Sequence, residues 1–290
     1  MSRARWTSLA RVESPGRLTP LAERFLGRTL YPVLRVVFRV SLEGDHHLPG
    51  AGGFLLVANH PPSLGTAEFA ALAAAYARRF GSSRPLAGFA HATSFGWWPL
   101  SWVFRQIGAI PSTYEAAADA LARGVPVALF PGGDHEGFRP FWQASRVDFG
   151  GRLGFLRIAR RAWVPVVPMG IAGVTAPLLM GSKLLAFLFV WPRLAGVKRY
   201  GLSVAALIGA AAILLLLPVG AVWRALLAWC WMGSPLALAS WFPARITIRI
   251  GQPLRPEDLF GDRSSPEDDV ALALALARVE AAVQAVLERG

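Results

Sequence analysis

The residues best suited to chemistry begin in the stretch LLVANHPPSLGTAEF, residues 55–69. An apolar run ends there in Asn59 and His60, and Glu68 is the sole acid over residues 46–114. A neutral imidazole can take a proton from a substrate hydroxyl when a carboxylate fixes its tautomer. His60 is therefore a candidate general base with Glu68 behind it. The competing interpretation is that His60 is only a polar cap on a buried strand.

A second candidate stretch is VALFPGGDHEGFRP, residues 127–140. Gly132 and Gly133 allow a tight turn, or let the backbone present its N–H groups to a ligand. Glu136 is suited to binding hydroxyls, and Arg139 to binding a phosphate. The alternative is an ordinary β-turn with solvated charges.

Other kinds of site find little support. The His46-His47 pair lies in the turn-like stretch EGDHHLPG, and the sequence contains none of the spacings typical of zinc sites. G-x-S-x-G, Walker and G-x-G-x-x-G patterns are missing as well. Cys230 is the single cysteine, so it cannot form an internal disulfide. The sequence predicts no metal site.

Elements that would position the two stretches alternate along the chain. Short apolar runs predict strands, and longer amphipathic runs predict helices. This alternation indicates an α/β fold with a central, mostly parallel sheet flanked by helices, in which functional groups gather where strands end. The predicted strands are 37–44, 53–59, 85–90, 125–131, 164–170 and 244–254, and the predicted helices are 66–80, 96–106, 114–123, 151–162 and a last one ending near Glu288.

A long apolar interval interrupts this alternation at residues 176–243, with five basic residues and no acid. Residues 200–223 and 225–244 are uncharged, and each is long enough to cross a bilayer as a helix. Pro218 and the Gly233-Ser234-Pro235 run would break such helices. We expect either two crossings or a hairpin that dips into one leaflet, inserted before the last strand; buried helices of a soluble protein are the alternative.

The predicted domain organisation follows from these patterns. Residues 1–35 form a basic amphipathic N-terminal segment in which Thr19-Pro20 begins a helix, and its face of Leu21, Phe25, Leu26, Leu30 and Leu34 covers either a membrane or the domain core. Residues 36–175 and 244–290 form the α/β domain, and residues 176–243 form a membrane-associated insertion. In the last segment, Ser265 to Asp268 resembles a capping box.

Composition points to an acidic partner. The net charge is +12, hydrophobic residues make up 54%, and charged residues only 17%. Eleven tryptophans and long apolar runs argue against nucleic acid and favour an anionic lipid leaflet, or an acidic ligand such as CoA. The N-terminus lacks the apolar core of a secretory signal, so we expect a cytoplasmic catalytic domain on the membrane, the inner membrane in a bacterium. The oligomeric state is not predicted.

Together the two stretches resemble the glycerolipid (lysophospholipid) acyltransferase superfamily. Its first block resembles VANH with a downstream acid, and the branch whose third block reads P-G-G-x-x-E resembles FPGGDHE. The second and fourth blocks resemble FRQIGAIPS (104–112) and VPVVPMGI (164–171). Two positions depart from the common pattern: Gly65 stands where that pattern has aspartate, and Gly132 stands where it has glutamate.

The resemblance implies a membrane-associated acyltransferase of phospholipid biosynthesis. It would move a fatty acyl group from acyl-CoA or acyl carrier protein, as co-substrate and without a cofactor, to a hydroxyl of a glycerolipid or lysophospholipid. His60 and Glu68 would be catalytic, and substrate-binding residues would be Asn59, Gly132, Gly133, Glu136 and Arg139. Arg146, Arg152 and Arg157 are further candidates for phosphates. A catalytically inactive lipid-binding relative and a membrane-anchored lipid hydrolase are the alternatives.

Overall fold

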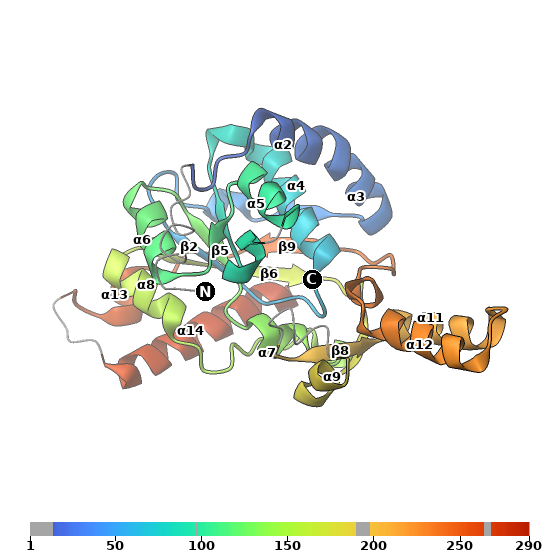
Figure 1. Cartoon of the computed structure of the whole chain (residues 1–290). Helices are drawn as coiled ribbons and strands as arrows, with labels where there is room; N and C mark the ends of the chain where they lie inside the picture. Colours follow the sequence, from blue (N-terminus) through green and yellow to red (C-terminus); the bar gives the residue numbers. More distant parts are fainter. Residues whose placement is uncertain (1–13, 97, 190–197, 264–267, 290) are drawn as a thin grey trace.

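The computed structural model describes residues 14–96, 98–189, 198–263 and 268–289. Seven strands form a central sheet in the order β1-β9-β6-β2-β5-β3-β4, with helices on both faces (Figure 1). All neighbouring pairs are parallel except β6 and β9. The predicted α/β fold with a mostly parallel sheet is therefore confirmed. The strands are β1 (Ser41–Glu43), β2 (Leu55–Ala58), β3 (Ala87–Ala90), β4 (Ile110–Pro111), β5 (Val127–Leu129), β6 (Val166–Ala172) and β9 (Thr247–Ile250).

Strand β2 shows how the sheet divides the core. Successive side chains of a strand point to opposite faces, and here both faces are covered, so all four residues are buried. Leu55 and Val57 pack in the core beneath α6 (Tyr114–Ala122), α8 (Gly154–Ala162) and α14 (Asp269–Glu288). Leu56 and Ala58 pack in the core beneath α4 (Thr66–Phe80).

The predicted helices 66–80, 114–123 and 151–162 are observed as α4, α6 and α8, and the prediction for 96–106 corresponds to α5 (Leu100–Gln106). The strand predicted over 37–44 begins too early, because α3 (Tyr31–Phe38) runs through its first residues. Arg39 ends this helix in the left-handed conformation at φ 47°. Only then does the chain extend into β1.

The N-terminal helix begins as predicted, with the Thr19 hydroxyl capping α2 (Pro20–Arg24). A π-helical turn (Phe25–Leu30) then joins α2 to α3. Phe25 and Leu26 are consecutive, so they point to different sides of the helix. Leu26 and Leu34 are buried, whereas Leu21 and Phe25 are 61% and 52% exposed. The predicted face is therefore divided between the core and the surface, and whether its exposed residues contact a membrane stays a prediction.

Residues 178–233 contain two strands that the sequence did not reveal. β7 (Leu178–Ser182) and β8 (Tyr200–Ser203) pair antiparallel, and α9 (Lys183–Leu188) follows β7. Two apolar helices, α11 (Val204–Leu216) and α12 (Ala221–Gly233), then form a hairpin that projects from the body of the molecule before β9 (Figure 1). Each has 13 residues and is thus about 20 Å long. The expected hairpin is present, and neither helix reaches the about 30 Å needed to cross a bilayer core.

Helix α14 is the helix that is long and apolar enough to cross a membrane in the described part of the chain. It lies along the sheet, with Leu272, Val279 and Val283 buried in the core, so it is a core helix. α13 (Pro256–Phe260) precedes it. The Asp268 carboxylate caps α14 by accepting a hydrogen bond from Val270 N–H at 3.1 Å; Ser265 to Glu267 lie outside the described residues. The division into domains stays a prediction.

Candidate active site

His60 lies just beyond the C-terminal end of β2, at the sheet edge where ligands of parallel sheets bind. Asn59 fixes this strand end by bonding to β6: its Nδ2 donates to Ile171 O at 3.0 Å, and its Oδ1 accepts from Ile171 N–H at 2.8 Å. Asn59 is only 2% exposed. Both ends of the Asn59 amide are bonded to the protein, so its observed contacts are structural. Its predicted substrate-binding role stays a prediction.

The His60 imidazole is held by the backbone. Its Nδ1 lies 2.7 Å from Pro61 O, and since a carbonyl can only accept, Nδ1 carries the proton and Nε2 keeps its lone pair. The imidazole packs edge-to-face with the rings of Phe69 and Phe130, with centroid separations of 5.1 and 6.0 Å. Burial lowers the pKa of His60, with the Pro61 carbonyl opposing that shift. The imidazole is thus neutral near pH 7, as a general base requires.

Glu68 is not hydrogen-bonded to His60, contrary to the predicted pairing. Its Oε1 accepts from Thr175 N–H at 3.1 Å and from Thr175 Oγ1 at 2.8 Å. Its Oε2 is buried without a hydrogen-bond partner among the described residues. The reason is local: Glu68 lies in the first turn of α4 and turns toward the loop after β6, while Pro61 already occupies Nδ1 of His60. Burial raises the pKa of Glu68.

At position 65, where the common pattern has an acid, neighbouring side chains leave little room for a Cβ atom. Gly65 has φ +57° and begins α4. A Cβ here would lie 3.1 Å from the Phe69 ring and 3.4 Å from Pro61 Cβ. An aspartate at this position would be strained, so in this chain the Pro61 carbonyl orients the imidazole instead.

Glu136 joins the two candidate stretches. The predicted glycine turn is in fact a short helix, α7 (Gly133–Gly137), which directs Glu136 inward. Its Oε2 accepts from His60 N–H at 2.8 Å, and its Oε1 accepts from Asp148 N–H at 2.9 Å and from Arg139 Nη2 at 3.0 Å. Burial raises the pKa of Glu136, and the two N–H donors and Arg139 oppose that rise. Three converging donors suit the ionised carboxylate, which can only accept hydrogen bonds.

The glycines of this stretch make room for side chains of the protein. A Cβ on Gly132 would lie 2.1 Å from Glu136 Oε2, and one on Gly133 would lie 2.7 Å from Arg152 Nη1. Gly133 N–H donates to Phe130 O at 3.1 Å, so it is not free for a ligand. Gly137, which the sequence did not single out, approaches the imidazole: its Cβ would lie 2.9 Å from His60 Nδ1.

Arg139 is turned inward. Its Nη2 bonds to Glu136 and to Arg146 O at 2.8 Å, and only 13% of its side chain is exposed. Arg157, another arginine considered for phosphates, pairs with Asp269. The predicted role of Arg139 in binding substrate stays a prediction, and its observed contacts position α7.

Asp134 and Arg152 form a second charged pair at α7. Arg152 donates to Pro131 O at 2.8 Å, to Gly132 O at 2.6 Å and to the Asp134 carboxylate. Burial opposes ionisation of Asp134, but the hydrogen bond and charge of Arg152 outweigh it and lower the Asp134 pKa. The charges of Asp134 and Arg152 also act on His60. Sequence reasoning missed Asp134 because local pattern does not distinguish it from a solvated acid.

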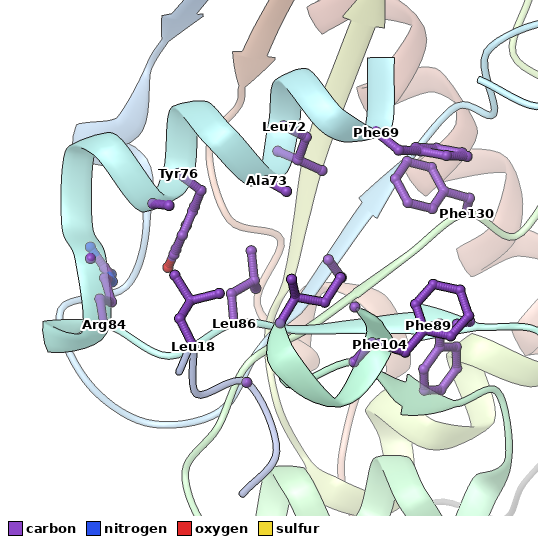
Figure 2. A pocket seen from close by; sticks show the side chains of 18 residues that line it. Leu18, Phe69, Leu72, Ala73, Tyr76, Arg84, Leu86, Phe89, Phe104 and Phe130 are labelled. Carbon is purple, nitrogen blue, oxygen red and sulfur yellow. The ribbon is translucent and has the colours of Figure 1, made fainter. Parts of the chain in front are cut away.

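An apolar pocket of about 190 Å³ shares two of its lining residues with the ring contacts of His60. Phe69 and Phe130, which contact the imidazole, line one end of it, and Tyr76 and Arg84 line the other (Figure 2). Ala73 on α4 lies between these ends (Figure 2). A flexible hydrocarbon chain suits such a lining. Among the described residues, no three His, Cys, Asp or Glu side chains are grouped to hold a metal.

Comparisons with known proteins match part of the chain. Residues 39–172 match the model of the Acyltransferase family. An uncharacterized protein of Mycobacterium tuberculosis (strain ATCC 25618 / H37Rv) is 32% identical over 167 residues, which are 56% of this chain and 46% of that protein. An uncharacterized protein of Mycobacterium leprae (strain TN) is 31% identical over 157 residues, 53% and 42% of the two chains. The chain thus matches less than half the length of these curated relatives.

Among solved structures, the chain is similar to the 1-acyl-sn-glycerophosphate (LPA) acyltransferase PlsC of Thermotoga maritima. The TM-score is 0.48 at 14% identity, over 93% of this chain and 81% of that one. A likeness this distant says nothing about the substrate. The matched residues include both candidate stretches and the strands β1 to β6, in their order along the chain. Through residues 39–172, slightly less than half of its length, the chain matches the model of the Acyltransferase family.

Proposed function

We propose that this chain is a membrane-associated acyltransferase that moves a fatty acyl group from an acyl thioester, acyl-CoA or acyl carrier protein, to a hydroxyl of a glycerolipid or lysophospholipid. One observation carries the proposal: the His60 imidazole, protonated at Nδ1, packs against Phe69 and Phe130, and these two rings line an apolar pocket. The base and a place for an acyl chain therefore adjoin each other.

The proposed reaction needs no covalent acyl-enzyme intermediate. His60 Nε2 takes the proton of the acceptor hydroxyl, and that oxygen attacks the thioester carbonyl. The tetrahedral intermediate collapses, the C–S bond breaks, and the thiolate receives the proton from the imidazolium. The charge of Asp134 favours the imidazolium, and that of Arg152 opposes it. We assign to Asp134 the stabilising role first given to Glu68.

Membrane association is supported by the hairpin of α11 and α12. Its tip exposes Leu215, Leu216 and Val222 by 77, 79 and 72%, while Ala206 and Ala228 near its base are buried. Such a large unpartnered apolar surface is unusual on a soluble monomer. One charge, Arg224, lies near the tip, and it is used internally because its Nη1 donates to Leu214 O at 2.9 Å. A hairpin of about 20 Å would enter one leaflet.

The test compares the purified full chain with His60→Ala, using labelled acyl-CoA and acyl carrier protein as donors and a panel of lyso-lipids and neutral glycerides. Removing a general base should lower the rate by about 10²- to 10⁴-fold. The control is His46→Ala, because His46 is an exposed histidine in a turn, and it should keep full activity.

The two alternatives are outcomes of the same test. Inactivity of the wild-type protein with every donor and acceptor would favour a lipid-binding relative, to which the replacement of the usual acid by Gly65 also points. Release of free fatty acid without ester would favour a hydrolase.

A further inference from the structure

Three arginines and three acids gather around α7. Arg139 pairs with Glu136, and Arg152 pairs with Asp134, so these four residues sum to zero. Arg199 adds a further positive charge that acts on Asp134. Asp148, whose pKa is lowered by its hydrogen bond to His135, adds a matching negative charge beside Arg139. What sets Arg199 apart is therefore its hydrogen bonding and not an excess of charge.

Arg199 reaches this place through the β7–β8 ribbon. It precedes β8, and β8 packs on the end of α7: a Cβ on Gly201 would lie 3.2 Å from Phe138 Cδ1. On β7, a Cβ on Gly181 would lie 2.0 Å from Phe138 O. These close backbone approaches bring residue 199 to the candidate active site, although the two are far apart in sequence.

Arg199 differs from Arg139 and Arg152 in its hydrogen bonding. Arg139 and Arg152 each donate to carboxylates and backbone carbonyls. Arg199 is half-buried, and it forms no hydrogen bond or ion pair within the described ranges. A guanidinium presents several donors in a plane and matches the oxygens of a phosphate.

We propose that Arg199 binds a phosphate group of a substrate beside His60. The Asp134 carboxylate accepts a hydrogen bond from Arg152 and also attracts the charge of Arg199. It would therefore hold the Arg199 guanidinium in place until the anion binds. Arg199 also lies at the base of the apolar hairpin, since Ser203, the residue that caps α11, ends the strand that Arg199 precedes. If the hairpin enters a leaflet, the base lies at the depth of lipid headgroups.

The phosphate has two possible sources within the proposed function, on which this inference rests: the headgroup of a lysophospholipid acceptor, or the phosphates of the CoA donor. Both present the same chemistry to Arg199. The experiment therefore measures binding of each separately, without turnover.

The variants are Arg199→Ala and Arg199→Lys in the full chain, with Lys198→Ala as the matched control. Lys198 is the exposed neighbour, so its loss removes the same charge from the same segment. Isothermal titration measures the Kd of three probes: hexanoyl-lysophosphatidic acid, hexanoylglycerol, which lacks the phosphate, and CoA. Thermal unfolding verifies that each variant folds.

Arg199→Ala should weaken one phosphate probe at least about tenfold, which is about 1.4 kcal/mol, and leave hexanoylglycerol unchanged. Arg199→Lys should retain part of the affinity, because a lysine keeps the charge but not the planar donors. A loss confined to the lysophosphatidic acid identifies the acceptor headgroup, and one confined to CoA identifies the donor.

An unchanged Kd for both phosphate probes would overturn the inference, and so would an equal loss in Lys198→Ala, which would indicate only a diffuse positive field. The outcome is distinguishable from a failure of the proposed function. If no acyl transfer is found with any acceptor but Arg199→Ala still weakens a phosphate probe, the phosphate site stands and the reaction does not.

Discussion

Replacing Glu136 with glutamine tests whether one carboxylate holds the two candidate catalytic stretches together. Three donors converge on it from His60 N–H, Asp148 N–H and Arg139, at 2.8 to 3.0 Å, and its side chain has no exposed area. Glutamine keeps one acceptor oxygen and introduces an NH₂ group. That group must face at least one N–H donor, so a bond becomes a donor–donor contact.

The magnitude follows from these contacts. Losing a hydrogen bond to a charged group costs about 1.5–3 kcal/mol, and removing one partner of a buried ion pair costs about 3–5 kcal/mol. The two losses overlap, because Arg139 contributes to both. The Arg139 side chain is 13% exposed, so water recovers part of the loss. We expect the free energy of unfolding to fall by about 3 kcal/mol, at the low end of the ion-pair range.

The assay is urea unfolding of the full chain, followed by far-UV circular dichroism, with Glu68→Gln as the matched control. Glu68 is equally buried, at 1% against 2% for Glu136, but its Oε1 has only Thr175 as partner. Glutamine can keep that oxygen, so the control should cost less than about 1 kcal/mol. Equal losses in the two variants would refute the reasoning that Glu136 is a charged junction.

The same control carries a prediction about pH. Because burial raises the pKa of Glu68 above its usual 4.5, the native state binds its proton more tightly than the unfolded state does. The contribution of this proton to the free energy of unfolding is fully present below pH 4.5. It is lost as the pH rises through the higher pKa of Glu68 in the native state. Glu68→Gln should therefore become more stable relative to wild type as pH rises; a difference that does not change with pH would contradict this.

Three further predictions concern activity and membrane binding. Because burial lowers the pKa of His60, kcat/KM should decrease as the pH is lowered, with an apparent pKa below 6.5. An apparent pKa at or above 6.5 on the acid side of this pH profile would contradict a buried base. Ala73→Trp, which fills the apolar pocket, should shift preference toward shorter acyl chains, whereas Ala118→Trp on an exposed face of α6 should not. Leu216→Glu at the hairpin tip should reduce sedimentation with anionic vesicles, whereas Val270→Glu, 67% exposed on α14, should leave it unchanged; equal losses would argue against the hairpin.

The sequence predicted those features that depend on local pattern. Hydrophobic periodicity set α4 at 66–80 to the residue, the order of the strands along the chain, and the position of His60 at a strand end. These follow from the chain itself, because a strand or helix must turn its apolar residues to one side. The same periodicity did not predict local irregularities of the backbone. Examples are the π-helical turn Phe25–Leu30 and the left-handed conformation of Arg39.

Tertiary structure alone decided which side chains meet. Glu68 is near His60 in sequence, yet it bonds to Thr175, while Glu136 reaches the backbone of His60 from another strand end. Arg199 reaches Asp134 only because β8 packs on α7. Spacing along a chain says where a residue sits on its own element. A hydrogen bond or ion pair depends on how separate elements are placed against one another, and the packing of the sheet and its helices determines that placement.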